Sequence, residues 1–304
     1  MFYRSFSQEM RRRFGRRVYK LSLDGGMTCP NRDGTLDSRG CIFCSGGSGT
    51  FASPSQPDID AQIAAAKARI SFKAGDNAAY IAYFQSYTNT YAPVERLREL
   101  FEPAIRRDDI AALSVATRPD CLGRDVLELL SELNAIKPVW VELGLQTIHE
   151  ETAKYIRRCY PLSVYDRAAG ALKSRGLELI THMILGLPGE SDEMIFATAE
   201  HIARSGADGI KLQLLHVLAG TDLAADYRAG KFETLSLEQY TLLLEGCIRR
   251  LRPDMTVHRL TGDGAKAELI APMWSADKKR VLGFILSAFE RDGLEQGSLY
   301  RNNE

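Results

Sequence analysis

Three cysteines, Cys29, Cys41 and Cys44, lie close together near the start of the sequence, and their spacing is the first sign of chemistry. The stretch around them is rich in proline, asparagine and glycine, so it forms a loop rather than a helix or strand. Three thiolates can hold three corners of a [4Fe–4S] cluster and leave the fourth iron open to an external ligand. A structural zinc site needs four ligands, yet the sequence has a single Cys-x-x-Cys and no histidine before His149. An open-site cluster is therefore favoured over a zinc site or a bare redox pair.

The other three cysteines, Cys121, Cys159 and Cys247, stand alone in the sequence. An isolated cysteine behaves as a small apolar residue and is among the most frequently buried residue types. We therefore expect each of the three to be a core residue rather than a ligand.

Polar residues also gather where the predicted strands end. Glu142 and Gln146 are four residues apart on one strand, so their side chains point to the same face, and a buried carboxylate is costly without a partner. In a parallel barrel, the reaction site forms at the carboxyl ends of the strands. Polar residues in such positions are Gln85, Thr88 and Asn89; Thr117, Arg118 and Asp120; Glu142 and Gln146; His182; Lys211, Gln213 and His216; His258 and Arg259.

The elements that must position these residues follow from the hydrophobic pattern, in which short apolar runs alternate with amphipathic stretches. The predicted strands are Val18–Leu23, Tyr80–Gln85, Ala112–Ala116, Val139–Gln146, Leu179–Leu185, Gly209–Leu215 and Thr256–Leu260. The predicted helices are Ile59–Phe72, Val94–Arg106, Arg124–Leu133, Val164–Arg175, Glu193–Arg204, Leu237–Arg250 and, near the end, Ala276–Phe289. Such alternation requires a parallel sheet with right-handed crossovers. The predicted fold class is α/β, a partial (β/α)6-type parallel barrel with a helical C-terminal extension.

We expect one domain with three parts: a basic N-terminal arm at 1–17, the barrel with its C-terminal helices at 18–292, and a polar tail at 293–304. The tail from Gln296 is predicted to be mobile. The basic residues between Arg4 and Lys20 face a single acid, Glu9. Two interpretations of the arm stay open, a solvated amphipathic helix and a contact for RNA or a nucleotide beside the rim of the barrel.

Composition limits the class of protein further. The formal net charge is zero, with 39 basic and 39 acidic residues, whereas a protein that grips long nucleic acid through its phosphates has a basic excess. No apolar run approaches the roughly 20 residues that span a bilayer, and no secretory signal follows the basic start. Six unevenly spaced cysteines do not build a disulfide scaffold, which predicts a reducing, cytoplasmic location and no membrane partner.

Taken together, these motifs resemble the radical S-adenosylmethionine (radical SAM) superfamily, in which a strand leads into a three-cysteine loop on a β/α barrel. Within it, residues 1–290 resemble the bacterial subgroup called YhcC- or YtqA-like, which is related to the radical domain of the elongator catalytic subunit. Eleven residues separate the first two cysteines, and the subgroup shares this spacing, which is longer than is usual in the superfamily. The stretches that carry the resemblance are DGGMTCPNRDGT (24–35), GCIFCSGGSG (40–49), YFQSYTNTYAPV (83–94), ATRPDCL (116–122), WVELGLQT (140–147), HMILGLPGE (182–190), GIKLQLLHVLAGT (209–221) and HRLTGDG (258–264).

The resemblance implies that Cys29, Cys41 and Cys44 ligate a [4Fe–4S] cluster and that S-adenosyl-L-methionine (SAM) binds its open iron. Reductive cleavage of SAM would give a 5′-deoxyadenosyl radical that takes a hydrogen from an unactivated carbon, while the protein binds, orients and excludes water. Glycines at 46, 47 and 49 would let the backbone approach the cluster. The residues implied to contact SAM are Phe43, Gln85, Ser86, Thr88, Glu142, Gln146, His182, Ile184 and Gly186, with Glu142 or Gln146 at the ribose hydroxyls.

Polar residues at the remaining strand ends are the candidates for the substrate side, and as a group they predict a polar, hydrogen-bonding substrate. They are Arg118, Asp120, Lys211, Gln213, His216, His258 and Arg259, with Asp263 beyond them. The catalytic residue is not singled out by the sequence, and the candidates for it are Glu142, His182 and His216.

Two reactions fit the resemblance, and both leave a primary aminomethyl group on a modified base. One cleaves free queuine to 7-aminomethyl-7-deazaguanine, and the other trims carboxymethylaminomethyl uridine at the wobble position of tRNA. Because the sequence shows neither a basic excess nor an added RNA-binding module, we rank the free base first. Both require a reductant such as flavodoxin or ferredoxin. The alternatives of another class are a non-catalytic, metal-stabilised nucleotide-binding scaffold and an iron–sulfur electron carrier.

Overall fold

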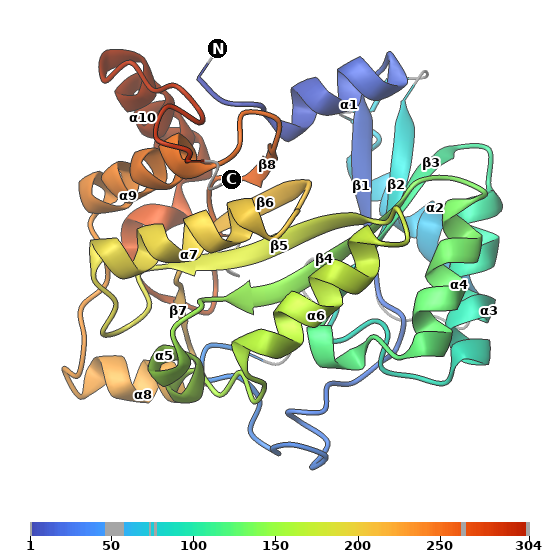
Figure 1. The fold of residues 1–304 in the computed structure, drawn as a ribbon, viewed down its shortest axis with the longest axis horizontal. Coiled ribbons are helices and arrows are strands. Elements are labelled where there is room, and N and C mark those ends of the chain that lie inside the picture. The colour runs from blue at the N-terminus through green and yellow to red at the C-terminus, as the bar shows by residue number, and fades with distance from the viewer. Residues whose placement is uncertain (1, 46–57, 73, 76–77, 263–265, 302–304) are drawn as a thin grey trace.

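A parallel sheet of seven strands carries the rest of the molecule (Figure 1). The structure is a computed structural model that describes residues 2–45, 58–72, 74–75, 78–262 and 266–301. Every neighbouring pair in the sheet is parallel, which confirms the predicted α/β partial-barrel class. In spatial order the strands are β1 (Val18–Leu23), β2 (Ala79–Phe84), β3 (Ile110–Thr117), β4 (Val139–Gln146), β5 (Glu178–Leu185), β6 (Gly209–Leu214) and β8 (Thr256–Arg259).

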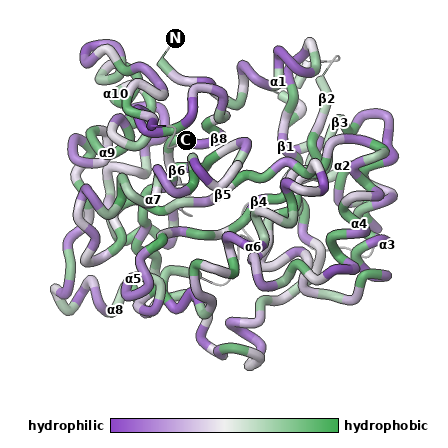
Figure 2. The backbone as a smooth tube through the Cα atoms, viewed as in Figure 1, coloured by the Kyte–Doolittle hydropathy of each residue, from purple (hydrophilic) through white to green (hydrophobic). Residues whose placement is uncertain are grey.

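Amphipathic helices cover the outer face of the sheet, because each buries one apolar stripe and exposes a charged one. In α3, for example, Leu97, Phe101 and Ile105 recur at intervals of four residues and are all fully buried. Figure 2 shows the same division, with hydrophobic strands inside and hydrophilic helix faces outside. The covering helices are α2 (Ile59–Ile70), α3 (Val94–Arg106), α4 (Arg124–Asn134), α6 (Leu162–Lys173), α7 (Asp192–Arg204) and α9 (Leu237–Arg250). All six lie where the sequence predicts a helix.

The N-terminal helix α1 (Phe6–Phe14) closes the end of the barrel at which the strands begin. Its Phe6 ring meets the Trp140 ring edge-on at 6.2 Å, and Ser5 forms a parallel bridge with Val257 in β8. In Figure 1, α1 lies at the top of the molecule, whereas the blue loop that follows β1 lies at the bottom. The expectation of a helix is therefore confirmed. The placement of this arm beside the rim is wrong, because α1 packs against the opposite end of the strands, and a contact with RNA or a nucleotide stays a prediction.

Several short elements have no counterpart in the sequence prediction, because strands of two or three residues and helices of one or two turns are too short to show a hydrophobic period. They are α5 (Glu150–Tyr155), α8 (Asp222–Arg228), the antiparallel pair β7 (Val217–Leu218) and β9 (Leu269–Ala271), and two short 3₁₀ turns, Pro119–Cys121 and Met273–Ala276. The C-terminal helix α10 (Lys278–Arg291) begins two residues later than predicted, since Asp277 caps its first turn.

The C-terminal tail is docked on the barrel as far as the structure describes it, which corrects the expectation of a mobile end. The Gln296 side chain accepts from the backbone N–H of Arg4 at 2.8 Å and donates to the carbonyls of Arg252 and Met255. The division of the chain into arm, barrel and tail stays our proposal. Among the described residues, no helix has the length and apolar character needed to cross a bilayer.

Candidate active site

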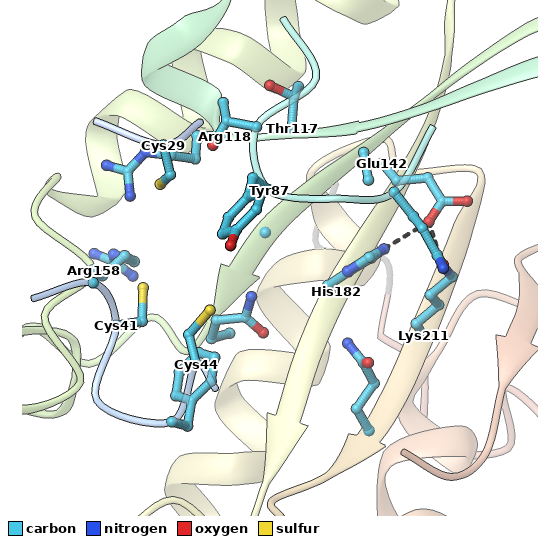
Figure 3. Close-up of a pocket in the computed structure, with 18 of the residues that line it drawn as sticks. Cys29, Cys41, Cys44, Tyr87, Thr117, Arg118, Glu142, Arg158, His182 and Lys211 are labelled. Atoms are coloured by element: carbon cyan, nitrogen blue, oxygen red, sulfur yellow. Dashed lines mark hydrogen bonds and ion pairs between the residues drawn. The ribbon is translucent and has the colours of Figure 1, made fainter. Parts of the chain in front are cut away.

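A cavity of about 480 Å³ opens at the carboxyl ends of the strands and brings many of the predicted polar residues together. Figure 3 shows its two sides, with the three cysteines on one and the Glu142, His182 and Lys211 side chains on the other. The size falls within the range typical of small-molecule and cofactor sites. The cavity is therefore the candidate active site.

The cysteine loop, residues 24–45, follows β1 and is held in place by the segment after α5. The Arg157 guanidinium donates to the carbonyl of Gly40 at 2.8 Å, and the Arg157 carbonyl accepts from the Asn31 amide at 2.7 Å. The same amide lies 3.6 Å from the Cys41 sulfur. Asn31 and Gly40 belong to no helix or strand, so regular backbone hydrogen bonds do not hold them. These contacts with Arg157 therefore fix the position of the loop.

Cys29, Cys41 and Cys44 all line the cavity. Burial raises the pKa of the Cys41 thiol to about 12, and Cys44 adds to the rise. Within the part of the chain that the structure describes, no three His, Cys, Asp or Glu side chains are grouped tightly enough to hold one metal ion. Three thiols that share a cavity without converging on one point suit a multi-iron cluster better than a zinc ion, whose sulfur ligands lie ~2.3 Å from the metal.

Next to the cysteines, the cavity wall contains a stack of arginine and tyrosine. The Tyr160 ring contacts two guanidinium groups, those of Arg118 at 5.1 Å and of Arg158 at 4.8 Å from the ring centroid. Arg118 is also paired with Asp120 at 2.7 Å, and this pair holds the pKa of Arg118 above its ordinary value despite the cost of burial. The stack builds a rigid, cationic wall, because both guanidinium groups are buried and each has a second anchor.

Two residues of the wall adopt a backbone conformation that non-glycine residues rarely adopt. Tyr87 has φ 57° and Gln146 has φ 71°, and the β4–β5 register shifts between Gly144 and Gln146. A bulge of this kind re-aims a side chain at the end of a strand. The Gln146 side-chain oxygen is buried and has no hydrogen-bond partner among the described residues. A strained residue with an unused acceptor in a cavity wall is typical of a ligand contact.

On the far side of the cavity lies the floor cluster, which we define as Lys20, Ser114, Glu142, His182 and Lys211. The Glu142 carboxylate is fully buried and accepts from Lys20 at 2.7 Å, Ser114 at 2.8 Å, His182 at 2.7 Å and, in addition, from Lys211. Because a carboxylate only accepts, the Nε2 atom of His182 carries the hydrogen in this contact. The cluster joins β1, β3, β4, β5 and β6 across the barrel interior.

Burial and charge together shift the pKa of every titratable member of the floor cluster. Burial alone would raise the pKa of Glu142, but the two lysines and His182 outweigh it and hold that pKa well below its ordinary value. Burial and the neighbouring Lys211 lower the pKa of His182 to about 4, so the ring is neutral. Burial lowers the pKa of Lys211 to about 7, and repulsion from Lys20 and Arg259 adds to this effect. The attraction of Glu142 opposes it but is weaker.

The structure brings most of the predicted site residues into this one cavity. From the predicted cofactor set, Phe43, Gln85, Thr88, Glu142, Gln146 and His182 line it, and from the predicted substrate set, Arg118, Lys211, Gln213 and Arg259 line it. Both oxygens of Glu142 already accept two hydrogen bonds each, whereas Gln146 has an unused oxygen. Of the two residues expected at the ribose hydroxyls, Gln146 is therefore the better placed.

Other predicted residues do not contribute to the lining. Asp120 pairs with Arg118 and faces a neighbouring groove, and the His258 ring lies 4.9 Å from the Phe6 ring at the α1 end of the barrel. His216 packs against Gly262. Ser86, Ile184 and Gly186 are absent from the described lining, and Ile184 belongs to a separate apolar cluster. The predicted glycines at 46, 47 and 49 and the aspartate at 263 lie outside the described residues.

Sequence reasoning missed several residues of the cavity and the floor cluster. Lys20 was counted with the basic residues of the arm. It lies in a strand, and the polar Ser22 follows two residues later on the same face, which indicates that both face inward. Tyr83 carries the same signal, because it precedes Gln85 by two residues. The wall residues Tyr160 and Arg158 follow α5, which was not predicted. Of the isolated cysteines, Cys247 is buried as expected, but Cys159 is exposed.

Comparisons with known proteins agree with this arrangement. The family model described as the radical SAM superfamily matches residues 38–202, and the radical SAM C-terminal domain model matches residues 207–291. The protein YtqA of Bacillus subtilis is 45% identical over 303 residues, which cover 99% of this chain and 94% of YtqA. A tRNA uridine(34) acetyltransferase of Methanocaldococcus jannaschii is 28% identical over 149 residues, 48% of this chain and 27% of that protein.

Among solved structures, the archaeal Elp3 of Methanocaldococcus infernus superposes with a TM-score of 0.70 at 18% identity. The match covers 92% of this chain, and the chain spans 64% of that Elp3 chain. At this level of identity the likeness concerns the fold, and it matches the seven-stranded parallel sheet described above.

Proposed function

Because this chain belongs to the radical SAM superfamily and, within it, to the YtqA-like group, we propose that it removes the carboxymethyl group from carboxymethylaminomethyl uridine at the wobble position of tRNA. Water is the second reactant, and the products are aminomethyl uridine and glyoxylate. The two-electron oxidation of the methylene would be balanced by the reduction of SAM to methionine and 5′-deoxyadenosine. As a superfamily member it is an enzyme, not a non-catalytic scaffold, and its cofactors are a [4Fe–4S] cluster and SAM. Together these cofactors supply a 5′-deoxyadenosyl radical that abstracts hydrogen from an unactivated carbon.

The residues present fit those cofactors. Cys29, Cys41 and Cys44 would hold three irons, since all three thiols face one cavity and are spread too widely for a single ion. SAM would lie against the wall that begins with these cysteines, where the buried, unpartnered oxygen of Gln146 can accept a hydroxyl hydrogen. The remaining contacts proposed for SAM are Phe43, Gln85, Ser86, Thr88, His182, Ile184 and Gly186. Three of these, Ser86, Ile184 and Gly186, are not among the described residues that line the cavity.

The observation that carries the choice of substrate is the surplus of cations in the floor cluster. Lys20 and Lys211 share a single carboxylate, Glu142, at the end of the cavity away from the cysteines. A buried surplus of positive charge favours an anionic ligand. The carboxymethyl substituent of the uridine ends in a carboxylate, whereas queuine has none. This supports the wobble uridine over the free base as the substrate. The ranking is the opposite of the one drawn from composition, which placed the free base first.

The relatives support the same choice. Nearly half of the chain is similar to proteins named as tRNA uridine(34) acetyltransferases, which act on the same base. An enzyme that reaches a base inside a closed cavity must take it out of its stack, and the wobble base lies in the single-stranded anticodon loop, where extrusion is least costly.

Free queuine is the second candidate, and one observation favours it. The net charge is zero, and the arginines of α1 lie at the opposite end of the barrel from the cavity, so they offer no contact for a tRNA docked at the rim. A small free base needs no such contact. Its cleavage at the aminomethyl nitrogen would use the same cavity.

The test is anaerobic reconstitution with iron and sulfide, followed by reduction in the presence of SAM, with dithionite or a flavodoxin system as the reductant. Queuine and tRNA that carries carboxymethylaminomethyl uridine are added in separate reactions. We expect aminomethyl uridine in the digested tRNA and more 5′-deoxyadenosine with that tRNA only. A 7-aminomethyl-7-deazaguanine peak with queuine, and no change in the tRNA, would move the function to queuine salvage.

A further inference from the structure

We propose that Lys211 is a specificity residue that binds the carboxylate of the substrate at the floor of the cavity. This inference rests on the proposed function and adds to it a named receptor inside the barrel. It also separates the two candidate substrates, because queuine has no acid group for Lys211 to bind.

The position of Lys211 is the first argument. Its side chain projects from β6 into the barrel, is 3% exposed, and lines the cavity. The ammonium donates to the Tyr83 hydroxyl at 2.8 Å and to Glu142. Figure 3 shows Lys211 and His182 both directed at Glu142, with His182 on the side nearer the cysteines. Because both oxygens of Glu142 are already occupied, Lys211 is the cationic group that the floor offers to an anionic ligand.

The number of charges is the second argument. Glu142 is the partner of Lys211 and also of Lys20, whose ammonium lies 2.7 Å from it. One carboxylate cannot neutralise two ammonium groups, and buried charge is expensive unless it is matched. The mismatch is visible in Lys211, because burial and the nearby cations lower its pKa to about 7. If the cluster served stability alone, neutral residues of similar volume would serve as well or better. A second lysine on the cavity wall is therefore explained by an anion that arrives with the substrate.

The groups that face Lys211 come from every neighbouring strand and allow a second, independent readout. They are Lys20 on β1, Tyr83 on β2, Ser114 on β3, Glu142 on β4, His182 on β5, and His258 and Arg259 on β8. Without ligand, the pKa of Lys211 is lowered to about 7. A bound carboxylate stabilises the ammonium form and raises this pKa, so binding takes up a proton above neutral pH. Affinity for the acid must then fall as the pH rises above 7.

The experiment uses the reconstituted enzyme with SAM and no reductant, so that binding is measured without turnover. The probes are the nucleoside 5-carboxymethylaminomethyluridine and its methyl ester, which removes the carboxylate charge and adds a methyl group. The ester is also titrated alone across the pH range, so that ionisation of its amine is subtracted. Charge-assisted hydrogen bonds of this kind are worth about 10- to 100-fold in affinity. We expect the wild-type enzyme to prefer the acid by that factor and Lys211→Met to bind acid and ester equally.

The matched control is Lys173→Met, since Lys173 pairs with Asp208 at 2.6 Å on the outside of the barrel and is remote from the cavity lining. It should keep the wild-type preference. If Lys211→Met does not fold, the wild-type enzyme alone decides, because its preference for the acid must shrink about tenfold between pH 7 and pH 9 while ester binding stays constant.

The receptor assignment is overturned if wild-type enzyme binds acid and ester equally, or if Lys211→Met keeps the preference. Either result leaves the proposed function standing when the tRNA is still converted. Conversely, loss of tRNA conversion in wild-type enzyme that still prefers the acid nucleoside would remove the proposed function and keep the receptor.

Discussion

Glu142 and Lys211 form an ion pair from two strands that are not neighbours, β4 and β6, with the His182 of β5 bonded to the same carboxylate. Lys20 completes the arrangement from β1, at the far edge of the sheet. The carboxylate therefore ties both halves of the barrel together directly beneath the cavity. Its loss should be felt in stability as well as in activity.

Replacement of Glu142 by glutamine tests the structural part of that statement. Glu142→Gln leaves Lys20 and Lys211 buried without a counter-charge, and removal of one partner from a buried pair typically costs about 3 to 5 kcal/mol. Lys211 is the buried member, whereas the Lys20 side chain is 19% exposed, so we expect a loss near the lower end of this range in the free energy of unfolding, measured by urea titration. The control is Glu128→Gln, which breaks an exposed pair with Arg124 and should cost less than about 1 kcal/mol. Equal losses for the two variants would contradict the account.

His182 should remain neutral far below the ordinary range of histidine. Its pKa in the folded protein is lowered from 6.5 to about 4, so between these values the unfolded chain binds more protons than the folded one. Stability therefore falls as the pH drops from 6.5 to 4. Imidazole ¹⁵N NMR should show a neutral ring, protonated at Nε2, at pH 5. A His182→Gln variant should lose this part of the pH dependence of unfolding, and an imidazolium signal at pH 6 would be inconsistent with the buried contact to Glu142.

The cysteine loop should carry the cluster without supporting the barrel. Cys41→Ala is expected to bind no cluster, to lack the brown visible absorbance, and to unfold at nearly the same urea concentration as the unreconstituted wild type, because the loop is held by the segment after α5 and is not part of the sheet. Cys159→Ala is the matched control, since Cys159 is exposed and its thiol donates to the carbonyl of Arg157. An unfolded Cys41→Ala protein would make the cysteines structural.

Gln146 combines backbone strain with a predicted contact to SAM, and two substitutions separate them. A non-glycine residue with φ 71° carries roughly 1 kcal/mol of strain that glycine does not. Gln146→Gly and Gln146→Ala should weaken SAM binding to the same extent, because both remove the amide. The glycine variant should be more stable than the alanine variant by about 1 kcal/mol, as measured by denaturant unfolding. Full SAM affinity in both variants would remove Gln146 from the site.

Much of the fold was predictable, because its signal is local. Each of the seven strands was predicted within two residues at either end, since buried parallel strands are short apolar runs bounded by turn residues. The cysteine loop and the inward-facing polar residues were predictable for the same reason. Glu142, His182 and Lys211 were assigned to the rim, whereas they lie within their strands and form the floor of the cavity.

What the sequence did not reveal is how these residues pair. Lys20 and Glu142 are 122 residues apart, and their contact depends on the register and curvature of the sheet, which no local pattern encodes. The same holds for the contacts of Tyr160 with Arg118 and Arg158. Tyr160 and Arg158 follow the short helix α5, which the sequence did not predict. His258 shows the converse, because its place in β8 suggested the rim while the Phe6 and Trp140 rings hold it at the opposite end.

The most direct test of the central claim follows hydrogen rather than product. The reconstituted enzyme is reduced with SAM and with tRNA whose carboxymethylaminomethyl uridine carries deuterium on the methylene between the nitrogen and the carboxylate. The account predicts deuterium in the 5′-deoxyadenosine and aminomethyl uridine in the tRNA. Cleavage of SAM without transfer of deuterium to 5′-deoxyadenosine would contradict it.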